Sequence, residues 1–388
     1  MSSNKKEPLI HIVKRGSIRW YHSVAIRGAA VVLALLACAL LIRVLTGKEP
    51  IDVYVTIYNA SFSEPWLTWP MLYSLAVLLC VGLALLPAFR MRFWNLGAEG
   101  QILAGGLATA ACMICLKDKC SHEVIILCMI VSGMLAGAIW GVIPAIFKAK
   151  WNTNETLFTL MMNYVAIQLV AYFGFVWESR QGAGTIGIIN QKDYIPGTKD
   201  RIGWLPNIHM ENWDPKGYAD KYLLTIIVAV VLLVLMTIYL NYTKHGYEIS
   251  VVGESQRTAR YVGIKVGKVI IRTMILSGAL CGLVGVLLVG GMKHTLNSSI
   301  TEGRGFVAVM VAWLAKLNPV WMILTSFLLV FLEKGSGDLS SNSELSLDKS
   351  FSDILTGIIL FFIIGSEFFV NYRICFRHKS GKEDIKHV

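Results

Sequence analysis

Long apolar runs, each bounded by a short polar stretch, follow one another along most of this chain. The runs are continuously apolar, unlike the alternating strands of a membrane β-barrel. A helix needs about 20 apolar residues to cross a bilayer. The pattern predicts ten helical segments, at 24–46, 71–88, 97–116, 124–147, 156–176, 222–240, 270–291, 306–316, 319–333 and 353–371.

The eighth and ninth segments are short and are separated by Asn318-Pro319. Proline disfavours a continuous helix at that point. Two arrangements fit this pattern: a tight helical hairpin, or two pieces of one broken span.

Composition agrees with a membrane-embedded chain. Of the 388 residues 55% are hydrophobic and 16% are charged, and the mean hydropathy is +0.58. A typical soluble domain has about 25% charged residues. We therefore expect an all-α, polytopic integral membrane protein without a separate soluble domain. Its expected parts are an amino-terminal segment (1–23), a transmembrane domain (24–371) with an extracytoplasmic loop (177–221) and a cytoplasmic loop (241–269), and a basic tail (372–388).

Lysine and arginine concentrate in alternate loops and at both ends of the chain, whereas 177–221 holds six basic and six acidic residues. Cytoplasmic loops carry the excess of basic residues in membrane proteins. Both chain ends are therefore predicted to be cytoplasmic, in a bacterial cytoplasmic membrane. The net charge of +11 follows from this topology, and a nucleic-acid partner is disfavoured because the basic residues are dispersed.

Glycines recur four residues apart in the fourth apolar segment, and a similar set occurs in the seventh. Small residues at this spacing let membrane helices approach closely. The glycines concerned are Gly133, Gly137, Gly141, Gly278, Gly282 and Gly285.

The stretch "WNTNETLFTLMMNYVA" carries polar side chains into an apolar helix. Thr156, Thr159 and Asn163 lie on one helical stripe. Such a stripe must face protein or water, because unsatisfied polar groups in hydrocarbon are costly. It either bonds a neighbouring helix or lines a path for a polar solute. Asn154 is a candidate helix cap, and Glu155 either belongs to the path or is an interfacial charge.

A second polar group lies in "RFWNLGAEGQILAGG". Asn95 and Glu99 share a face if this stretch is helical, whereas Gly97 and Gly100 indicate a break or a close approach. An ionisable residue inside a span is a functional candidate. Glu99 is expected either to belong to a solute path or to pair near the surface with Arg90 or Arg92.

A third feature is the cytoplasmic loop, where Gly253 and Gly263 bracket an amphipathic stretch at about 254–262. A short helix on the cytoplasmic face suits docking to another protein. An ordinary solvated loop is the alternative.

Four motifs together resemble the permeases of ABC importers, in the branch for nucleosides and simple sugars, which is related to ribose and branched-chain amino acid permeases. They are "FWNLGAEGQ", "NETLFTLMMNY", "VVGESQRTARYVGI" and "GRGFVAVMVAWLAKLNP". The chain departs from the family's "GYGF" by carrying Arg304.

The resemblance implies a membrane-spanning subunit that forms the path for a small polar solute, most often a purine nucleoside. Its implied partners are a second, homologous permease, a separate ATPase that binds ATP and Mg²⁺, and an extracytoplasmic solute-binding lipoprotein. The residues it places near the path are Asn95, Glu99, Asn154, Glu155, Thr156, Thr159 and Asn163. The residues it assigns to ATPase coupling are Gly253, Glu254, Ser255, Arg257, Arg260, Tyr261 and Gly263.

The sequence contains no P-loop motif, so ATP hydrolysis is expected in the partner, and this chain is expected to be neither an enzyme nor a metal or cofactor carrier. A sugar or riboflavin-like vitamin importer is an alternative within the same class. An ion-coupled secondary transporter is a further alternative, which would show broken mid-membrane helices with ionisable residues. An intramembrane enzyme is disfavoured, because no catalytic constellation is clustered in the sequence.

Overall fold

All ten predicted apolar segments coincide with helices in the computed structural model. The structure describes residues 10–15, 19–47, 49–178, 182, 185–195, 200–209, 216–341 and 349–376. The ten helices are α1 (Trp20–Thr46), α3 (Pro65–Arg90), α4 (Ala98–Leu116), α5 (His122–Trp151), α6 (Glu155–Val176), α7 (Asp220–Tyr242), α10 (Val266–Val286) with its π-helical extension η1 (Leu287–Lys293), α11 (Arg304–Leu314), α12 (Pro319–Ser341) and α13 (Lys349–Asn371).

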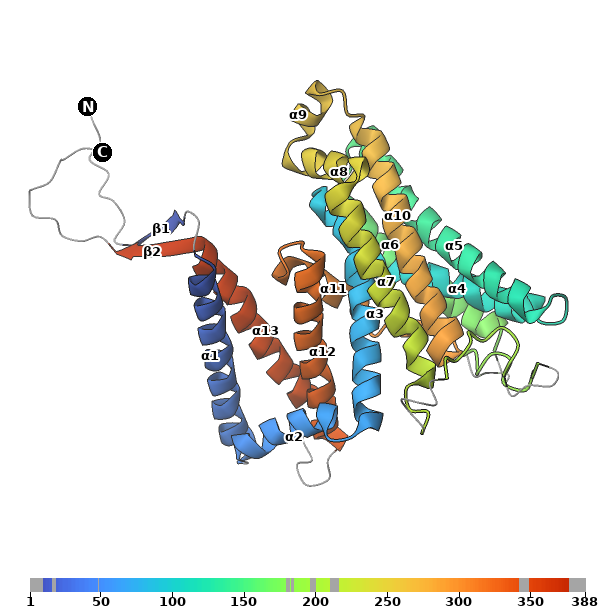
Figure 1. Cartoon of the computed structure of the whole chain (residues 1–388), viewed down its shortest axis with the longest axis horizontal. Helices are drawn as coiled ribbons and strands as arrows, with labels where there is room; N and C mark the ends of the chain where they lie inside the picture. The colour runs from blue at the N-terminus through green and yellow to red at the C-terminus, as the bar shows by residue number, and fades with distance from the viewer. Residues whose placement is uncertain are drawn as a thin grey trace, which may run out of the picture. The chain divides into compact units, whose positions relative to one another are not determined.

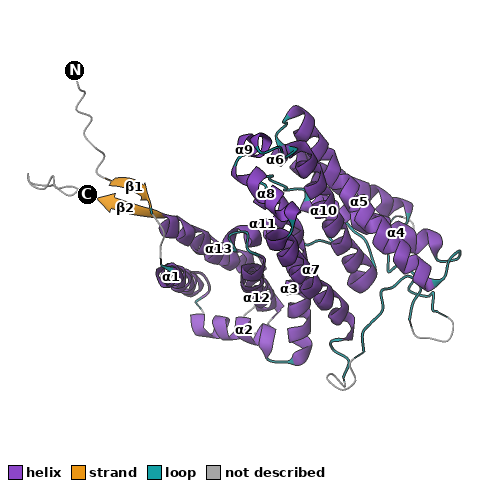
Figure 2. Cartoon of the chain, turned by 45° about the horizontal axis from the view of Figure 1, so that its top comes forward, coloured by secondary structure: helices purple, strands orange, loops and turns teal. Residues whose placement is uncertain are grey.

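Seven of the described helices are long and apolar enough to cross a membrane. The protein is therefore an all-α, polytopic membrane protein, while the count of ten spans stays a prediction. Figure 2 shows how completely helices make up the described chain. Two helices were not predicted, α2 (Pro50–Phe62) and α8 (Lys244–Glu254), whereas α9 (Gln256–Tyr261) lies within the amphipathic stretch predicted at about 254–262.

The chain divides into two compact units: residues 1–60 with 332–388, and residues 61–331. In the first unit α1 packs along α13. The strands β1 (Ile10–Lys14) and β2 (Tyr372–Phe376) pair antiparallel there, with Ile10 opposite Phe376. The sequence did not predict these strands. Their pairing brings the two ends of the described chain together, and their cytoplasmic location stays a prediction.

In the second unit α3 is the most enclosed span, with 89% of its most apolar window buried. It packs against α7, α10 and α11, and α10 packs in turn against α4 and α5. Figure 1 shows α3, α7 and α10 side by side.

The glycines of α5 and α10 meet where these helices pack together. Close packing at the glycines was predicted, but the pairing of these two helices was not. A Cβ atom on Gly137 would lie 2.3 Å from the carbonyl oxygen of Gly278, and one on Gly282 would lie 2.2 Å from that of Gly133. No side chain fits in either place. We call the contact between Gly133, Gly137 and Gly141 of α5 and Gly278 and Gly282 of α10 the glycine interface.

The expected break at Asn318-Pro319 is present. α11 ends at Leu314 and α12 begins at Pro319, with Lys316 and Leu317 at φ of 51° and 57° between them. The Thr325 hydroxyl donates to the Val311 carbonyl at 3.4 Å, so α12 folds back onto α11. Of the two predicted alternatives, the structure therefore has the helical hairpin.

Candidate functional site

Two helices of the second unit begin inside the protein. α4 starts at Ala98 after a non-helical stretch in which Phe93 and Asn95 are buried. α11 starts at Arg304, which is itself buried. Asn95 therefore lies before α4 and does not share a helical face with Glu99, which corrects the conditional prediction. The first turn of a helix leaves unpaired N–H groups, and the polar residues of this region satisfy them.

The side chain of Asn95 bonds to the turn before α4 and to α10. Its Oδ1 accepts from the Gly97 N–H at 3.0 Å and from Gln101 Nε2 at 3.2 Å. Its Nδ2 donates to the hydroxyl oxygen of Ser277 in α10 at 3.3 Å. Asn95 thus closes the turn before α4 and joins it to α10.

Thr159 and Asn163 of α6 hold the same turn from the other side. Asn163 Oδ1 accepts from the Gly100 N–H at 2.9 Å, and its Nδ2 donates to the Leu96 carbonyl at 2.8 Å. The Thr159 hydroxyl oxygen accepts from the Leu96 N–H at 3.2 Å. Both side chains are hydrogen-bonded and buried. These bonds agree with the first of the two alternatives, and a place on the solute path stays a prediction.

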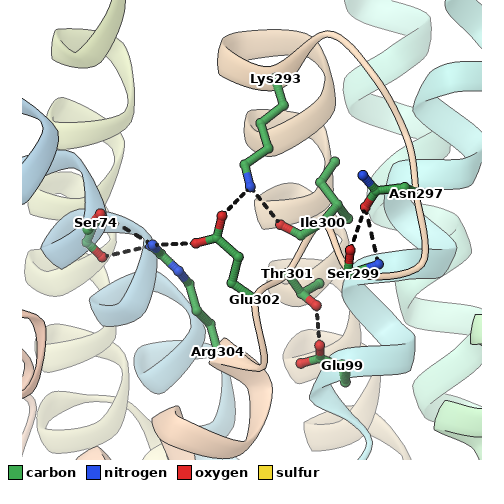
Figure 3. Close-up of polar contacts among 9 residues, drawn as sticks. All are labelled: Ser74, Glu99, Lys293, Asn297, Ser299, Ile300, Thr301, Glu302 and Arg304. Atoms are coloured by element: carbon green, nitrogen blue, oxygen red, sulfur yellow. Dashed lines mark hydrogen bonds and ion pairs between the residues drawn. The ribbon is translucent and has the colours of Figure 1, made fainter. Parts of the chain in front are cut away.

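Glu99 joins the start of α4 to the start of α11. One carboxylate oxygen accepts from the Gly305 N–H at 2.9 Å, and the other accepts from the Thr301 hydroxyl (Figure 3). A carboxylate is stabilised at a helix N-terminus by the exposed N–H groups and the helix dipole, and Glu99 lies at two such ends. Of the two alternatives for Glu99, the pairing with Arg90 or Arg92 is wrong. We call Asn95, Glu99, Gln101, Thr159, Asn163, Ser277 and Thr301 the polar junction.

A chain of charges lies beside the junction, and of its members the sequence had singled out Arg304 alone, as a departure from the family's motif. Glu302 accepts from Lys293 Nζ at 2.5 Å and from Arg304 Nη2 at 3.1 Å. The guanidinium of Arg304 also donates to the carbonyl and hydroxyl oxygens of Ser74 in α3, at 3.1 and 3.2 Å (Figure 3). Arg304 therefore fixes the start of α11 against α3. The signal in the sequence that could have identified this chain of charges is three ionisable residues next to apolar segments, namely Lys293, Glu302 and Arg304.

The remaining path candidates lie at the amino end of α6. Asn154 Oδ1 accepts from the Leu157 N–H at 3.2 Å, so Asn154 caps the helix. Glu155 pairs with Lys148 at 2.8 Å. Thr156 is half-buried and its carbonyl accepts from the Thr159 hydroxyl at 3.2 Å. The side chains of Asn154 and Glu155 therefore bond outside the polar junction, whereas the Glu155 carbonyl accepts from the Thr159 hydroxyl at 2.8 Å.

The predicted coupling residues lie on two consecutive helices, α8 and α9. Ser255 separates them and caps α9 by accepting from the Thr258 N–H at 3.2 Å. Gly253 belongs to α8, where a Cβ would lie 2.0 Å from the Arg90 carbonyl at the end of α3. Gly263 follows α9 with φ of +84°. Glu254, Arg257, Arg260 and Tyr261 are exposed.

An ion pair anchors α8 to α10. Arg272 donates to Glu248 at 2.9 Å. Desolvation raises the pKa of Glu248, but the hydrogen bond and charge of Arg272 outweigh it, and the pKa lies below its usual range. With Gly253 packed on α3, α8 is held at both sides while α9 projects. A cavity of about 560 Å³ beside α9 is lined by Lys148, Lys150, Arg257 and Arg260, among others.

At the opposite end of the second unit, described parts of the 177–221 loop pack onto the segment after η1. The Ile189 N–H donates to the His294 carbonyl at 2.8 Å, and the Thr295 hydroxyl donates to the Ile186 carbonyl at 2.6 Å. The Trp204 ring stacks on His294 with centroids 3.4 Å apart. This loop therefore covers the segment that leads to α11.

A bundle of apolar helices, a buried polar junction and a projecting helical loop define a membrane transport subunit. The family described as the permease component of the branched-chain amino acid transport system matches residues 66–364. The chain belongs to this family, whose members are permease components of ABC transporters and not enzymes. The protein is accordingly a multi-pass protein of the bacterial cell membrane, and the family implies an ATPase and a substrate-binding partner.

Several relatives cover most of the chain. The guanosine ABC transporter permease NupP of Bacillus subtilis is 29% identical over 339 residues, covering 87% of this chain and 92% of NupP. The glucose ABC transporter permease TsgB13 of Haloferax volcanii is 25% identical, covering 88% of each chain. The nucleoside ABC transporter permease NupB of Lactococcus lactis is 25% identical, covering 82% of this chain and 84% of NupB. No solved structure matches.

Proposed function

We propose that this permease carries a nucleoside, with a purine nucleoside as the preferred solute. Two of the relatives named above transport guanosine or nucleosides according to their names. A monosaccharide is the second candidate, because the glucose permease is similar over an equal share of the chain. The solute is delivered by an extracytoplasmic binding lipoprotein, and a second, homologous permease completes the path.

The proposed transport mechanism rests on one observation: the first turns of α4 and α11 meet at Glu99. A helix that begins inside the bundle can tilt at its non-helical lead-in without breaking the rest of the helix. The starts of α4 and α11 are tied together through Glu99, and both are tied to neighbouring spans, through Asn163 and Arg304. The polar junction therefore transmits a movement of α3, α6 or α10 to both helices. We assign it a positioning role and no direct part in binding.

The proposed contact with the ATPase is made by α9. α9 is a capped helix of six residues with exposed arginines on its surface, and α8 connects it rigidly to α3 and α10. A projecting helix of this kind can enter a cleft of an ATPase and pass on its closure. We propose Arg257 and Arg260 as the anchoring charges of that contact.

The test is uptake by the assembled transporter in proteoliposomes, with the binding protein outside and ATP inside. Labelled guanosine should accumulate with ATP, and should not accumulate with an ATPase subunit that binds but cannot hydrolyse ATP. Excess unlabelled guanosine should compete, and glucose should not. Competition by glucose alone would assign the sugar. Accumulation that needs a proton or sodium gradient and no ATP would contradict the proposal.

A further inference from the structure

The segment between η1 and α11 runs along α4 inside the second unit. The side chain of Leu296 lies 3.4 Å from the Cβ position of Gly106, and Thr301 bonds to Glu99. Gly106 and Glu99 are seven residues apart on α4, which corresponds to about 10 Å at 1.5 Å per helical residue. Because α4 is a candidate membrane span, residues 296–301 lie beside the first half of a span and are not helical.

Non-helical backbone at this depth is tolerated only where it is buried in protein or lines a water-filled cavity. One side of this segment is buried, through Leu296, Ile300 and Thr301. The other side is exposed and wholly polar. It consists of Asn297, Ser298, Ser299 and Glu302, and we call it the polar face.

The polar face is held rigidly. Asn297 Oδ1 accepts from the N–H and the hydroxyl of Ser299, at 3.1 and 3.2 Å, which leaves both Nδ2 hydrogens without a partner in the described chain. The Glu302 carboxylate lies between Lys293 and Arg304, so its charge is balanced. Its side chain is still 45% exposed. Figure 3 shows Asn297, Ser299 and Glu302 on the same short segment.

We propose that the polar face is a wall of the solute path and contacts the hydroxyl groups of the solute. Lipid cannot cover it, because four polar side chains would lose their partners in hydrocarbon. The amide of Asn297 and the hydroxyls of Ser298 and Ser299 donate hydrogen bonds, and the carboxylate of Glu302 accepts them. Vicinal hydroxyls, as in ribose or a hexose, match such a mixed surface. The identity of the solute rests on the proposed function. The access of water to the polar face rests only on the exposure of its side chains.

Water access is tested by cysteine substitution in the assembled transporter. Ser298→Cys is compared with Val231→Cys, an exposed apolar position in the middle of α7. A membrane-impermeant thiol reagent is applied from both sides, and labelling of the parent chain is subtracted. Only a hydrated thiol ionises to the reactive thiolate, so labelling at Ser298 should be faster by about tenfold or more. Equal, slow labelling at both positions would overturn the inference.

Solute contact is tested with Ser299→Ala and Asn297→Ala, measuring apparent affinity for guanosine and for 2′,3′-dideoxyguanosine. Each variant should weaken the apparent affinity for guanosine by about 5- to 12-fold, since a lost hydrogen bond contributes about 1–1.5 kcal/mol. The affinity for the dideoxy compound should be unchanged. Glu64→Gln, on an exposed turn, should change neither affinity. Unchanged discrimination in both variants would contradict the contact.

The two proposals fail separately. If guanosine is not transported but Ser298→Cys is labelled and protected by glucose, the nucleoside assignment is wrong and the polar face stands. If guanosine is transported but Ser298→Cys reacts no faster than Val231→Cys, the nucleoside assignment stands and the polar face is covered, by a second copy or another subunit.

Discussion

The glycine interface and the polar junction hold helices together by opposite means within one unit. At the glycine interface the backbones of α5 and α10 touch, and shape alone excludes any larger residue. At the polar junction the helices are joined by specific hydrogen bonds between side chains and free backbone groups. Close packing gives a contact with a single geometry, whereas hydrogen bonds to a helix start can be exchanged for others. We therefore infer that α5 and α10 form a rigid pair, whereas the starts of α4 and α11 can move.

The largest effect is expected at the glycine interface. Gly137→Ala places a methyl group 2.3 Å from a backbone oxygen, so the helices must separate. Overpacking of this kind costs about 1–3 kcal/mol, occasionally more. The variant should lower the unfolding temperature in detergent and the yield of assembled transporter. Gly28→Ala, which meets no atom within 4 Å, is the matched control, and equal stability of the two variants would refute the packing argument.

A somewhat smaller effect is expected for Asn163→Leu at the polar junction. The change leaves the Gly100 N–H and the Leu96 carbonyl without their partner, at a cost of about 1–3 kcal/mol. Uptake should fall by more than assembly does, because the start of α4 loses its tie to α6. Met161→Leu, at an exposed neighbouring position, serves as the control. Normal uptake with normal assembly would show that this tie is dispensable.

Much of the helical arrangement could be predicted from the sequence, because it depends on local patterns. Span-length apolar runs and glycine spacing are local patterns, and both match the helices and their crossing. The polar stripe of Thr159 and Asn163 was recognised, but its partners were not, since Asn163 bonds residues 63 and 67 positions away. For Glu99 the sequence left open a place on a solute path or a pair with Arg90 or Arg92, whereas the partners in the structure, Thr301 and Gly305, lie more than 200 residues along the chain.

The missed elements are short. α2 has 13 residues and contains Asp52, Thr56 and Asn59, so it is neither long nor apolar enough to read as a span. The β1–β2 pair joins the two ends of the chain, which no local pattern connects.

A smaller effect is expected for Glu99→Gln. The amide oxygen can still accept from the Gly305 N–H or the Thr301 hydroxyl, and the charge at two helix starts is lost. The helix-dipole contribution is about 0.3–1 kcal/mol at exposed ends and up to about 2 in partly buried ones. Most uptake should survive, with the same pH profile as the parent. Complete loss of transport with a changed pH dependence would favour an ion-coupled transporter.

The smallest effect is expected at the partly buried pair of Arg272 and Glu248, whose side chains are 35% and 18% exposed. Glu248→Gln should cost about 0.5–1 kcal/mol, because solvent at the partly exposed Arg272 side chain screens the pair. The lowered pKa means that the parent's stabilisation is present above the usual glutamate pKa and is lost as pH falls through the lowered value. Thermal unfolding from pH 7 down to pH 3 should converge for the two proteins. A constant difference would exclude an electrostatic origin.

The central claim is that α9 couples this permease to an ATPase, and receptor-stimulated ATP hydrolysis by the reconstituted complex tests it most directly. The double variant Arg257→Glu with Arg260→Glu reverses the exposed charges of α9 without touching a span. Arg15→Glu with Arg373→Glu reverses as many exposed charges elsewhere. Only the α9 variant should lose ATPase co-purification or the response of ATP hydrolysis to the loaded binding protein. Normal assembly with normal stimulated hydrolysis in that variant would contradict it.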